Sequence, residues 1–388
     1  MAKVIDVLRR FLPAYLDSGP VLSPVQGRAI WAIEHCRTAM LGGHFFRCED
    51  CAQGRAFAYH SCNHRACPQC GREETRRWVR RELDKRVGAP YFMVTFTLPA
   101  ELRELFFGPK AKEAYDLFFG AAAGALCEKL ANAKWLGAVV SGFICVLHTW
   151  NQLLLFHPHL HCIVPGAGID SEGKVVRVKN ANFLLPYRVL SGAFRQHFRL
   201  RLEQAGWEVD PAVWRKEWGV NIQPFSDAAG NGAEANAIKY LGAYVCRTAI
   251  GDSRIVGMDE ATVTFRWKDR SDHNRDKQST ISGVEFVRRY LRHVLPRGLR
   301  SIRRYGYCHP AAKNQRERLQ LHTGMPLVIG APPDQSEPRS HPRRCPCCGG
   351  VMKPVAKLPR QWAPSPTAWK LRRRLRAPPE VPANKDAA

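Results

Sequence analysis

The sequence has no long apolar run and no apolar core near its start. Among its 388 residues, no stretch approaches the roughly 18 consecutive apolar residues that a membrane-spanning helix needs. The first residues also lack the apolar core and small-residue cleavage site of a secretory signal. We therefore expect a cytoplasmic protein without a membrane partner.

Acidic residues are scarce as well. The chain has 34 Asp and Glu against 59 Lys and Arg, which gives a formal charge of +25 and an isoelectric point near 9.9. Such a balance predicts a polyanionic partner, most simply nucleic acid, with an anionic membrane surface as the weaker alternative. A hydrophobic content of 45% indicates a globular protein, and the length allows two or three domains.

Cysteine, in contrast, is plentiful. A cytoplasmic chain with 14 cysteines is expected to use them for metal binding, because that compartment keeps thiols reduced. The pairs Cys48/Cys51 and Cys67/Cys70 have the spacing of a four-cysteine structural zinc site, which has no open position for catalysis. The remaining candidates for a second zinc ion are Cys36, His44, Cys62 and His64, with His35 and His60 as alternative ligands.

The C-terminal part of the chain is rich in Pro, Arg and Ser. We expect residues 325–388 to form a mostly irregular tail. Within it, Cys345, Cys347 and Cys348 stand in a Cys-Pro-Cys-Cys-Gly-Gly sequence that resembles one knuckle of a zinc ribbon. No second knuckle is evident in the tail, so its metal binding stays open.

Hydrophobic periodicity predicts an α+β fold, with strands separated by long helices. The expected strands are residues 91–98, 142–148, 160–164 and 261–267. The expected helices are residues 73–87, 102–133, 190–204, 233–248 and 284–295. We expect a zinc-binding domain with a basic helix over residues 1–88, a catalytic domain over 89–324 and the tail beyond.

One of the predicted strands carries His159-Leu160-His161. Side chains two apart on a strand point to the same face, so His159 and His161 can present two imidazoles to one divalent ion. The alternative is a pair of histidines that are simply satisfied or exposed. A third ligand could come from Gln152 or His148, although His148 also fits a core histidine.

One of the predicted helices carries Tyr240 and Tyr244. Residues four apart lie on one helix face, so the two phenols can serve one reaction centre. Packing in the core or at its rim is the alternative. Arg247 follows on the same side of the helix and could bind a phosphate, or could be an exposed charge.

A basic stretch with interleaved tyrosines follows. Cations that track phosphates and aromatic rings that stack on bases suit single-stranded DNA, whereas a solvated helix face is the alternative. The predicted DNA-binding residues here are Arg288, Arg289, Arg292, Arg303 and Arg304.

The order of these motifs resembles the IS91-type transposases of bacterial insertion sequences, from about residue 20 to residue 325. It implies an HUH endonuclease core, in which a central antiparallel sheet is flanked by helices. In this resemblance, His159 and His161 bind a catalytic divalent ion, and Tyr240 and Tyr244 are the nucleophiles. The implied reaction is single-strand DNA nicking and rejoining through a 5′-phosphotyrosine, in rolling-circle-like transposition of the element's own ends.

The chemistry of the residues agrees with this resemblance. A tyrosine hydroxyl, with a reference pKa of about 10, is a poor nucleophile at neutral pH and needs a phosphate polarised by a metal. Two imidazoles with oxygen ligands suit Mn²⁺ or Mg²⁺. Two other interpretations stay open: a rolling-circle replication initiator of a plasmid or phage, and a non-catalytic zinc-dependent DNA-binding protein.

Overall fold

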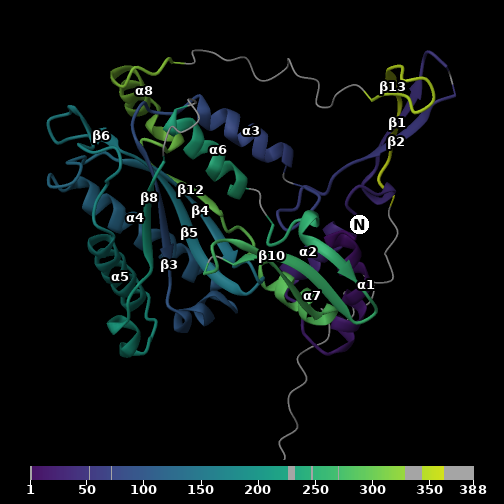
Figure 1. Cartoon of the computed structure of the whole chain (residues 1–388), viewed down its shortest axis with the longest axis horizontal. Helices are drawn as coiled ribbons and strands as arrows, with labels where there is room; N and C mark the ends of the chain where they lie inside the picture. The colour runs from purple at the N-terminus through teal and green to yellow at the C-terminus, as the bar shows by residue number, and fades with distance from the viewer. Residues whose placement is uncertain are drawn as a thin grey trace, which may run out of the picture. The chain divides into compact units, whose positions relative to one another are not determined.

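The computed structural model divides the chain into two compact units, drawn in Figure 1. It describes residues 2–51, 53–70, 72–225, 232–245, 248–269, 271–327 and 343–361. The first unit comprises Met1–Gly71, Thr248–Val294 and Pro332–Ala388, and the second comprises Arg72–Arg247 and Leu295–Ala331. Within the described residues, no helix is long and apolar enough to cross a membrane.

These units do not follow the expected division at residues 88 and 324. The predicted basic helix belongs to the second unit. Residues 248–294, which lie within the predicted catalytic domain, belong to the first. Local periodicity cannot reveal such an exchange, because it reports the elements and not their tertiary partners.

The second unit is built on a five-stranded antiparallel sheet with the order β12-β4-β5-β3-β8. The strands are β3 (Tyr91–Thr97), β4 (Gly142–Trp150), β5 (Phe156–Pro165), β8 (Val220–Pro224) and β12 (Ile302–Gly306). The predicted α+β class with a central antiparallel sheet is thus confirmed. β5, which carries the two predicted metal ligands, is the middle strand of the sheet.

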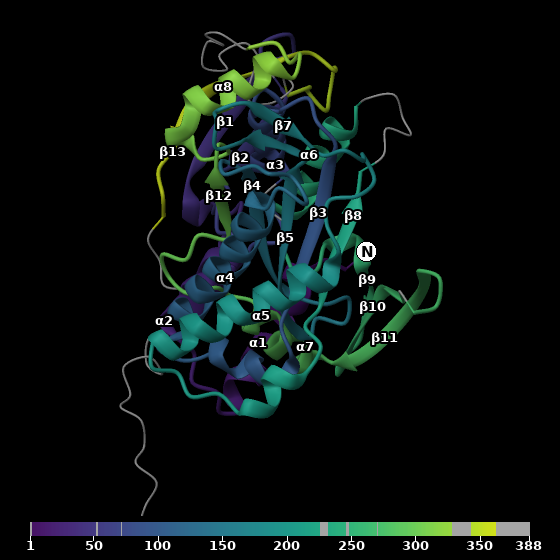
Figure 2. The same ribbon diagram turned by 90° about the vertical axis from the view of Figure 1, so that its left-hand side faces the viewer.

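Helices cover both faces of this sheet (Figure 2). On one face lie α4 (Ala111–Ala131) and α5 (Tyr187–Gln204), packed on Phe92, Phe96 and Phe143. The other face carries α3 (Arg72–Leu83) and α6 (Ala233–Val245), and its core includes Met93, Ile144 and Ile163. Since side chains alternate along a strand, odd-numbered residues of β3 and β5 and even-numbered residues of β4 face α6.

Smaller elements complete the second unit. They are the 3-10 helices η2 (Ala100–Phe106), η3 (Pro211–Arg215) and η5 (Pro310–Ala312), the hairpin β6 (Ala167–Ile169) and β7 (Val175–Arg177), and α8 (Lys313–His322).

The first unit contains helices and two small sheets. Its helices are α1 (Val4–Asp17), α2 (Pro24–Glu34) and α7 (Gly283–Arg292), with the 3-10 turns η1 (Ala39–Leu41) and η4 (Asp252–Arg254). One sheet has the order β11-β10-β9, formed by β9 (Ile255–Met258), β10 (Thr262–Asp269) and β11 (Arg275–Ser282). Helix α1 packs on α7, where Gly283 leaves room for the Phe11 ring.

The other small sheet, here called the ribbon, joins distant parts of the sequence. It has the order β13-β1-β2, with β1 (Gly43–Cys48), β2 (Arg55–Tyr59) and β13 (Met352–Leu358), and neighbouring strands are antiparallel. The expectation of an irregular tail was therefore wrong for β13. This strand is exposed along most of its length, so it lacks the apolar alternation that marks a strand in a sequence.

Candidate metal and nucleophile site

The structure brings a third histidine to the predicted pair. His148 on β4 lies opposite His159 on β5 in the antiparallel register, and His161 lies two residues further along the same face. One ring nitrogen from each of these histidines lies within 4.8 Å of the others, which is a distance suited to a shared metal ion. His148, one of the two residues considered for the third ligand, therefore stands beside the pair, whereas Gln152 lies in the turn between β4 and β5.

Hydrogen bonds orient the two imidazoles on β5. His159 Nδ1 lies 2.7 Å from the backbone oxygen of His157, and since a carbonyl only accepts, Nδ1 carries the hydrogen. His161 Nδ1 lies 3.3 Å from the hydroxyl of Thr95 on β3. These contacts orient the two rings, as hydrogen-bonded neighbours do for the histidine ligands of metal sites.

The side chain of His148 is oriented by helix α6. Its Nε2 donates to the backbone oxygen of Tyr244 at 2.9 Å, which leaves Nδ1 as the acceptor nitrogen. Its ring stacks on Trp150 and on Tyr244, with centroid separations of 4.5 and 5.0 Å. The side chain is only 3% exposed. It therefore has the burial of a core histidine together with the placement of a ligand.

The two tyrosines of α6 lie beside this histidine cluster. Their hydroxyl oxygens are 2.6 Å apart, so one phenol donates a hydrogen bond to the other. The Tyr244 ring is centred 4.7 Å from that of His161, while Tyr240 is 44% exposed. Tyr244 therefore faces the histidines and Tyr240 faces solvent.

Helix α6 is fixed by its other side chains. Ala237, Ile238 and Leu241 are buried in the core beneath the sheet. A Cβ on Gly242 would stand 2.1 Å from Cγ2 of Val79 on α3. The glycine thus permits the close approach of α3.

Two neighbours of the cluster escaped the sequence analysis. Thr95 lies on a strand that carries no other sign of function, and only its register opposite His161 reveals it. The second neighbour is Arg103 of η2, whose Nη2 lies 3.0 Å from Nδ1 of His157. His157 of β5 therefore contacts a cation.

The predicted DNA-binding arginines fall in both units, and several form ion pairs. Arg288 and Arg289 bind Glu285 of the same helix at 2.5 and 2.7 Å. In the second unit, Arg304 contacts Glu82 of α3 at 2.5 Å.

Arg303, also in the second unit, forms an ion pair with Asp116 of α4. The stretch from Arg288 to Arg304 is free of acids in the sequence, but the fold supplies acids from elsewhere. Arg292 is half-buried at the end of α7, and Arg247 lies outside the described residues.

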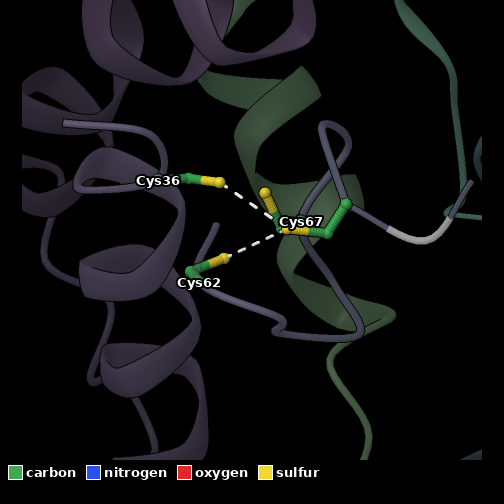
Figure 3. A group of neighbouring side chains, drawn as sticks. Cys36, Cys62 and Cys67 are labelled. Carbon is green, nitrogen blue, oxygen red and sulfur yellow. Dashed lines mark hydrogen bonds between the residues drawn. The ribbon is translucent and has the colours of Figure 1, made fainter. Parts of the chain in front are cut away.

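The cysteines are grouped differently from the prediction. Cys36, Cys62, Cys67 and Cys70 place their Sγ atoms within 4.8 Å of one another. Cys70 Sγ lies 3.6 Å from those of Cys36 and Cys62. Figure 3 shows the side chains of Cys36, Cys62 and Cys67 turned toward one another.

The predicted set Cys48, Cys51, Cys67 and Cys70 is therefore split between two clusters. The first pair instead joins Cys345 and Cys348. Spacing identifies knuckles, but it does not say which knuckles share an ion when several are present.

His44 and His64, the other predicted ligands of a second site, are used differently. The His44 ring packs edge-on against His60 at 5.2 Å. His64 Nδ1 accepts the backbone N–H of Ala66 at 3.2 Å. Neither belongs to the two cysteine clusters that the described residues form.

Comparisons with known proteins agree with this architecture. Residues 7–98 match the family model of the transposase zinc-binding domain, and residues 142–316 match that of a putative transposase. A putative transposase y4qJ of Sinorhizobium fredii is 35% identical over 89% of this chain and 92% of its own length. The transposase for insertion sequence element IS801 of Pseudomonas savastanoi is 26% identical over 83% of this chain and 82% of its own.

The chain thus has a sheet that carries clustered histidines, and it also has two cysteine clusters. With the family matches, these features define a DNA-processing enzyme of the transposase class. The chain is a member of the IS91 family of transposases. The zinc-binding domain and its cysteines support structural zinc.

Proposed function

We propose that this transposase is an HUH endonuclease that nicks and rejoins single-stranded DNA at the ends of its element. The observation that carries the proposal is the placement of Tyr244 between the histidine cluster and Tyr240. The proposed metal ligands and the proposed nucleophiles thus lie on one face of the antiparallel sheet, which supports a shared reaction centre. The packing of α6 on the sheet does not by itself require the tyrosines to lie beside the histidines.

The histidine cluster fits a divalent ion. A hydrogen bond orients each of His148, His159 and His161, and one ring nitrogen from each lies within 4.8 Å of the others. Mn²⁺ or Mg²⁺ would be held by these imidazoles, with phosphate oxygens and water completing the ligand set. When bound, the ion supplies positive charge that polarises the scissile phosphate.

The proposed reaction conserves the energy of the phosphodiester. A tyrosine oxygen bonds to the scissile phosphorus as the bond from phosphorus to the 3′ oxygen breaks. The phenol loses its proton and the 3′ oxygen gains one, which leaves a 5′-phosphotyrosine and a free 3′-OH. The reverse attack by a 3′-OH rejoins the strand, so neither water nor ATP is consumed.

The tyrosine pair suits two successive transfers. The hydroxyls of Tyr240 and Tyr244 are hydrogen-bonded to each other, so both oxygens lie close to one reaction centre. After Tyr244 has taken a strand end, Tyr240 still offers a hydroxyl. Two covalent links can then be held during the exchange of strand ends.

Cationic surfaces supply contacts for the DNA backbone. At the edge strand β12, Arg303 and Arg304 line a polar cleft of about 500 Å³, together with Arg300 and Lys112. The arginines of α7 and Arg247 are proposed phosphate contacts too. Arginines already paired with carboxylates would exchange those partners for phosphates, a competition that favours a strongly anionic ligand.

The test is a search for a covalent adduct. Purified protein is incubated with labelled single-stranded DNA from the ends of its element and with Mn²⁺ or Mg²⁺, then denatured. We expect a shifted protein band that is lost in His159→Ala and in the Tyr240→Phe/Tyr244→Phe double variant. Tyr187→Phe, which alters an exposed tyrosine on α5, is the matched control and should retain the adduct.

Other outcomes would point elsewhere. Adducts with replication origins but not with element ends would indicate a replication initiator. Tight binding without an adduct under both metals would indicate a non-catalytic DNA-binding protein. An adduct that persists in the double tyrosine variant would refute the assignment of the nucleophiles.

A further inference from the structure

The second cysteine cluster draws its ligands from the two ends of the described chain. Cys48 and Cys348 have their Sγ atoms 3.5 Å apart, and Cys51 and Cys345 have theirs 3.7 Å apart. The partners in these pairs are separated by 300 and 294 residues. The match to the transposase zinc-binding domain ends at residue 98, so it contains only half of this cluster.

The sulfur separations suit a metal better than disulfides. A disulfide requires an S–S distance of about 2.05 Å, far shorter than either pair. A tetrahedral zinc ion with Zn–S bonds of about 2.3 Å sets its sulfurs about 3.8 Å apart. The observed pairs approach this value, and all four sulfurs lie within 4.8 Å of one another.

The C-terminal cysteines stand on a turn shaped for ligand binding. The backbone N–H of Cys347 points to Cys345 Sγ at 3.4 Å, a contact that favours a thiolate. The backbone oxygen of Cys345 accepts the N–H of Gly349 at 2.9 Å, and Gly349 has a φ of +75°. This left-handed conformation favours glycine and folds the segment back on itself.

The N-terminal half leaves room for this turn. Gly54 follows the Cys48/Cys51 knuckle, and a Cβ on it would lie 2.2 Å from Cys345 Sγ. A side chain there would displace the sulfur. The hairpin of β1 and β2 is therefore shaped to receive the C-terminal knuckle.

The ribbon also lacks a core large enough to hold it together. Its buried apolar cluster comprises Cys48, Cys345 and Met352, with Phe46, Cys51 and Ala56 packed alongside. Small sheets of this kind usually require a metal, since so little apolar surface is buried.

We propose that Cys48, Cys51, Cys345 and Cys348 bind a second structural zinc ion, which closes a zinc ribbon across the whole transposase chain. The C-terminal knuckle is then a part of the N-terminal fold and not an appendage. Loss of residues 343–361 would remove two ligands and strand β13, and would leave the β1–β2 hairpin without its metal.

The test counts zinc ions in full-length variants. Because the histidine cluster can also take zinc, all chains carry His159→Ala and His161→Ala. We expect two zinc ions per chain in this background and one after Cys345→Ser/Cys348→Ser. The matched control is Cys347→Ser, which alters an exposed neighbour outside the cluster and should keep both ions.

Cobalt substitution provides a second readout of the two sites, which does not depend on a variant that loses its fold. Substitution of Co²⁺ in the background chain should give the thiolate charge-transfer absorption of two four-sulfur sites, and Cys348→His should change the spectrum of one. The proposal is overturned if the background chain holds a single four-sulfur site. It is also overturned if the Cys345/Cys348 variant keeps two zinc ions.

A second inference rests on the outer face of the ribbon. Phe45 lies opposite Phe57 in the strand register, and the rings of Phe57 and Tyr59 are parallel with centroids 6.2 Å apart. Phe57 is 53% exposed and Tyr59 36%. Aromatic rings arranged in this way on an open sheet can stack on unpaired bases.

Cations extend the same face. Arg47 lies directly opposite Arg55 on one side and Lys353 on the other, and all three side chains are exposed. Like charges directly opposite on neighbouring strands destabilise a sheet. Lys353 is paired with Glu49, which offsets part of this repulsion. An anionic partner bound over the two arginines would offset the remaining repulsion between their charges.

The structure assigns this aromatic and cationic face to single-stranded DNA. The inference rests on the proposed function, because it takes DNA as the partner. Fluorescence anisotropy with a labelled single-stranded oligonucleotide tests the two separately. We expect Phe57→Ala/Tyr59→Ala to weaken binding at least about tenfold, while the control Tyr187→Ala, which alters an exposed tyrosine of α5, binds like the unaltered protein.

Equal affinity of Phe57→Ala/Tyr59→Ala and the unaltered protein would refute this surface and leave the nuclease proposal standing. Failure of the unaltered protein to bind any single strand would count against both. Equal loss of binding to duplex DNA would show that the face recognises phosphates rather than unpaired bases.

Discussion

His148 donates a hydrogen bond from Nε2 to the backbone oxygen of Tyr244, at 2.9 Å. The bond joins a candidate metal ligand on β4 to the helix that carries the candidate nucleophiles. The orientation of the imidazole and the position of α6 are therefore coupled. A change at either end should affect both metal binding and covalent attack.

The first prediction concerns His148. His148→Ala should raise the Mn²⁺ concentration for half-maximal adduct formation by at least about tenfold, because a ligand and its link to α6 are both lost. Titration of adduct yield against Mn²⁺ measures this. His157→Ala, whose ring contacts Arg103, should have a smaller effect. An unchanged titration for His148→Ala would show that His148 is a core histidine only.

The second prediction concerns the packing of α6 on α3. Gly242→Ala places a methyl group against Val79, and overpacking of this kind costs about 1–3 kcal/mol. Chemical denaturation should show the loss, and Val79→Ala should restore part of it in the double variant. The control is Gly192→Ala in α5, where a Cβ meets no atom within 4 Å and stability should not fall. Additive effects of the Gly242 and Val79 changes would contradict the proposed contact.

The sequence predicts the sheet unit well because its elements carry strong local patterns. The apolar run of β3 and the His-Leu-His alternation of β5 mark strands, and these lie where expected. The spacing of Tyr240 and Tyr244 predicts one helix face, and the structure places both hydroxyls together. Their catalytic roles stay predictions, since geometry alone does not demonstrate chemistry.

The remaining features depend on partners distant in sequence. Strand β13 pairs with β1 although its own residues are mostly exposed. Cys48 meets Cys348 rather than Cys67, because the choice among knuckles is made by tertiary structure. Arg304 bonds to Glu82 of another element. Local periodicity contains no information about such pairings.

The third prediction concerns the arginines of α7. The guanidinium of Arg288, with that of Arg289, lowers the pKa of Glu285 to about 2. The carboxylate therefore stays charged throughout pH 5–8 and holds both arginines. Glu285→Gln should free them, tighten single-stranded DNA binding and steepen its dependence on salt, since each added phosphate contact contributes a slope of about 0.7.

The measurement is oligonucleotide affinity between low and moderate salt at pH 7. Asp259→Asn, which removes an acid that bonds within its own turn, is the control for the change in net charge. If both variants gain the same affinity, the arginines of α7 do not contact DNA. A change of the effect between pH 5 and 8 would contradict a carboxylate that is fully charged in that range.

The fourth prediction separates the two kinds of metal. Three imidazoles hold Mn²⁺ far more weakly than four thiolates hold zinc, whose binding in small domains contributes about 10–16 kcal/mol at neutral pH. Brief dialysis against EDTA should therefore abolish adduct formation while the thiolate-bound zinc stays in place. Addition of Mn²⁺ alone should restore the adduct, and zinc analysis before and after should give the same content.

Stronger treatment should affect the first unit instead. Acidification protonates the thiolates and releases zinc, so the cluster of Cys36, Cys62, Cys67 and Cys70 should open. Tyr290 would then lose its place, because its hydroxyl donates to Ala66 within that loop at 2.5 Å. We expect the return to neutral pH to restore activity only when zinc is added with Mn²⁺. If Mn²⁺ alone suffices after complete zinc loss, the cysteine clusters are dispensable for the folded enzyme. If zinc is needed after mild EDTA, the histidine cluster is not the catalytic metal site.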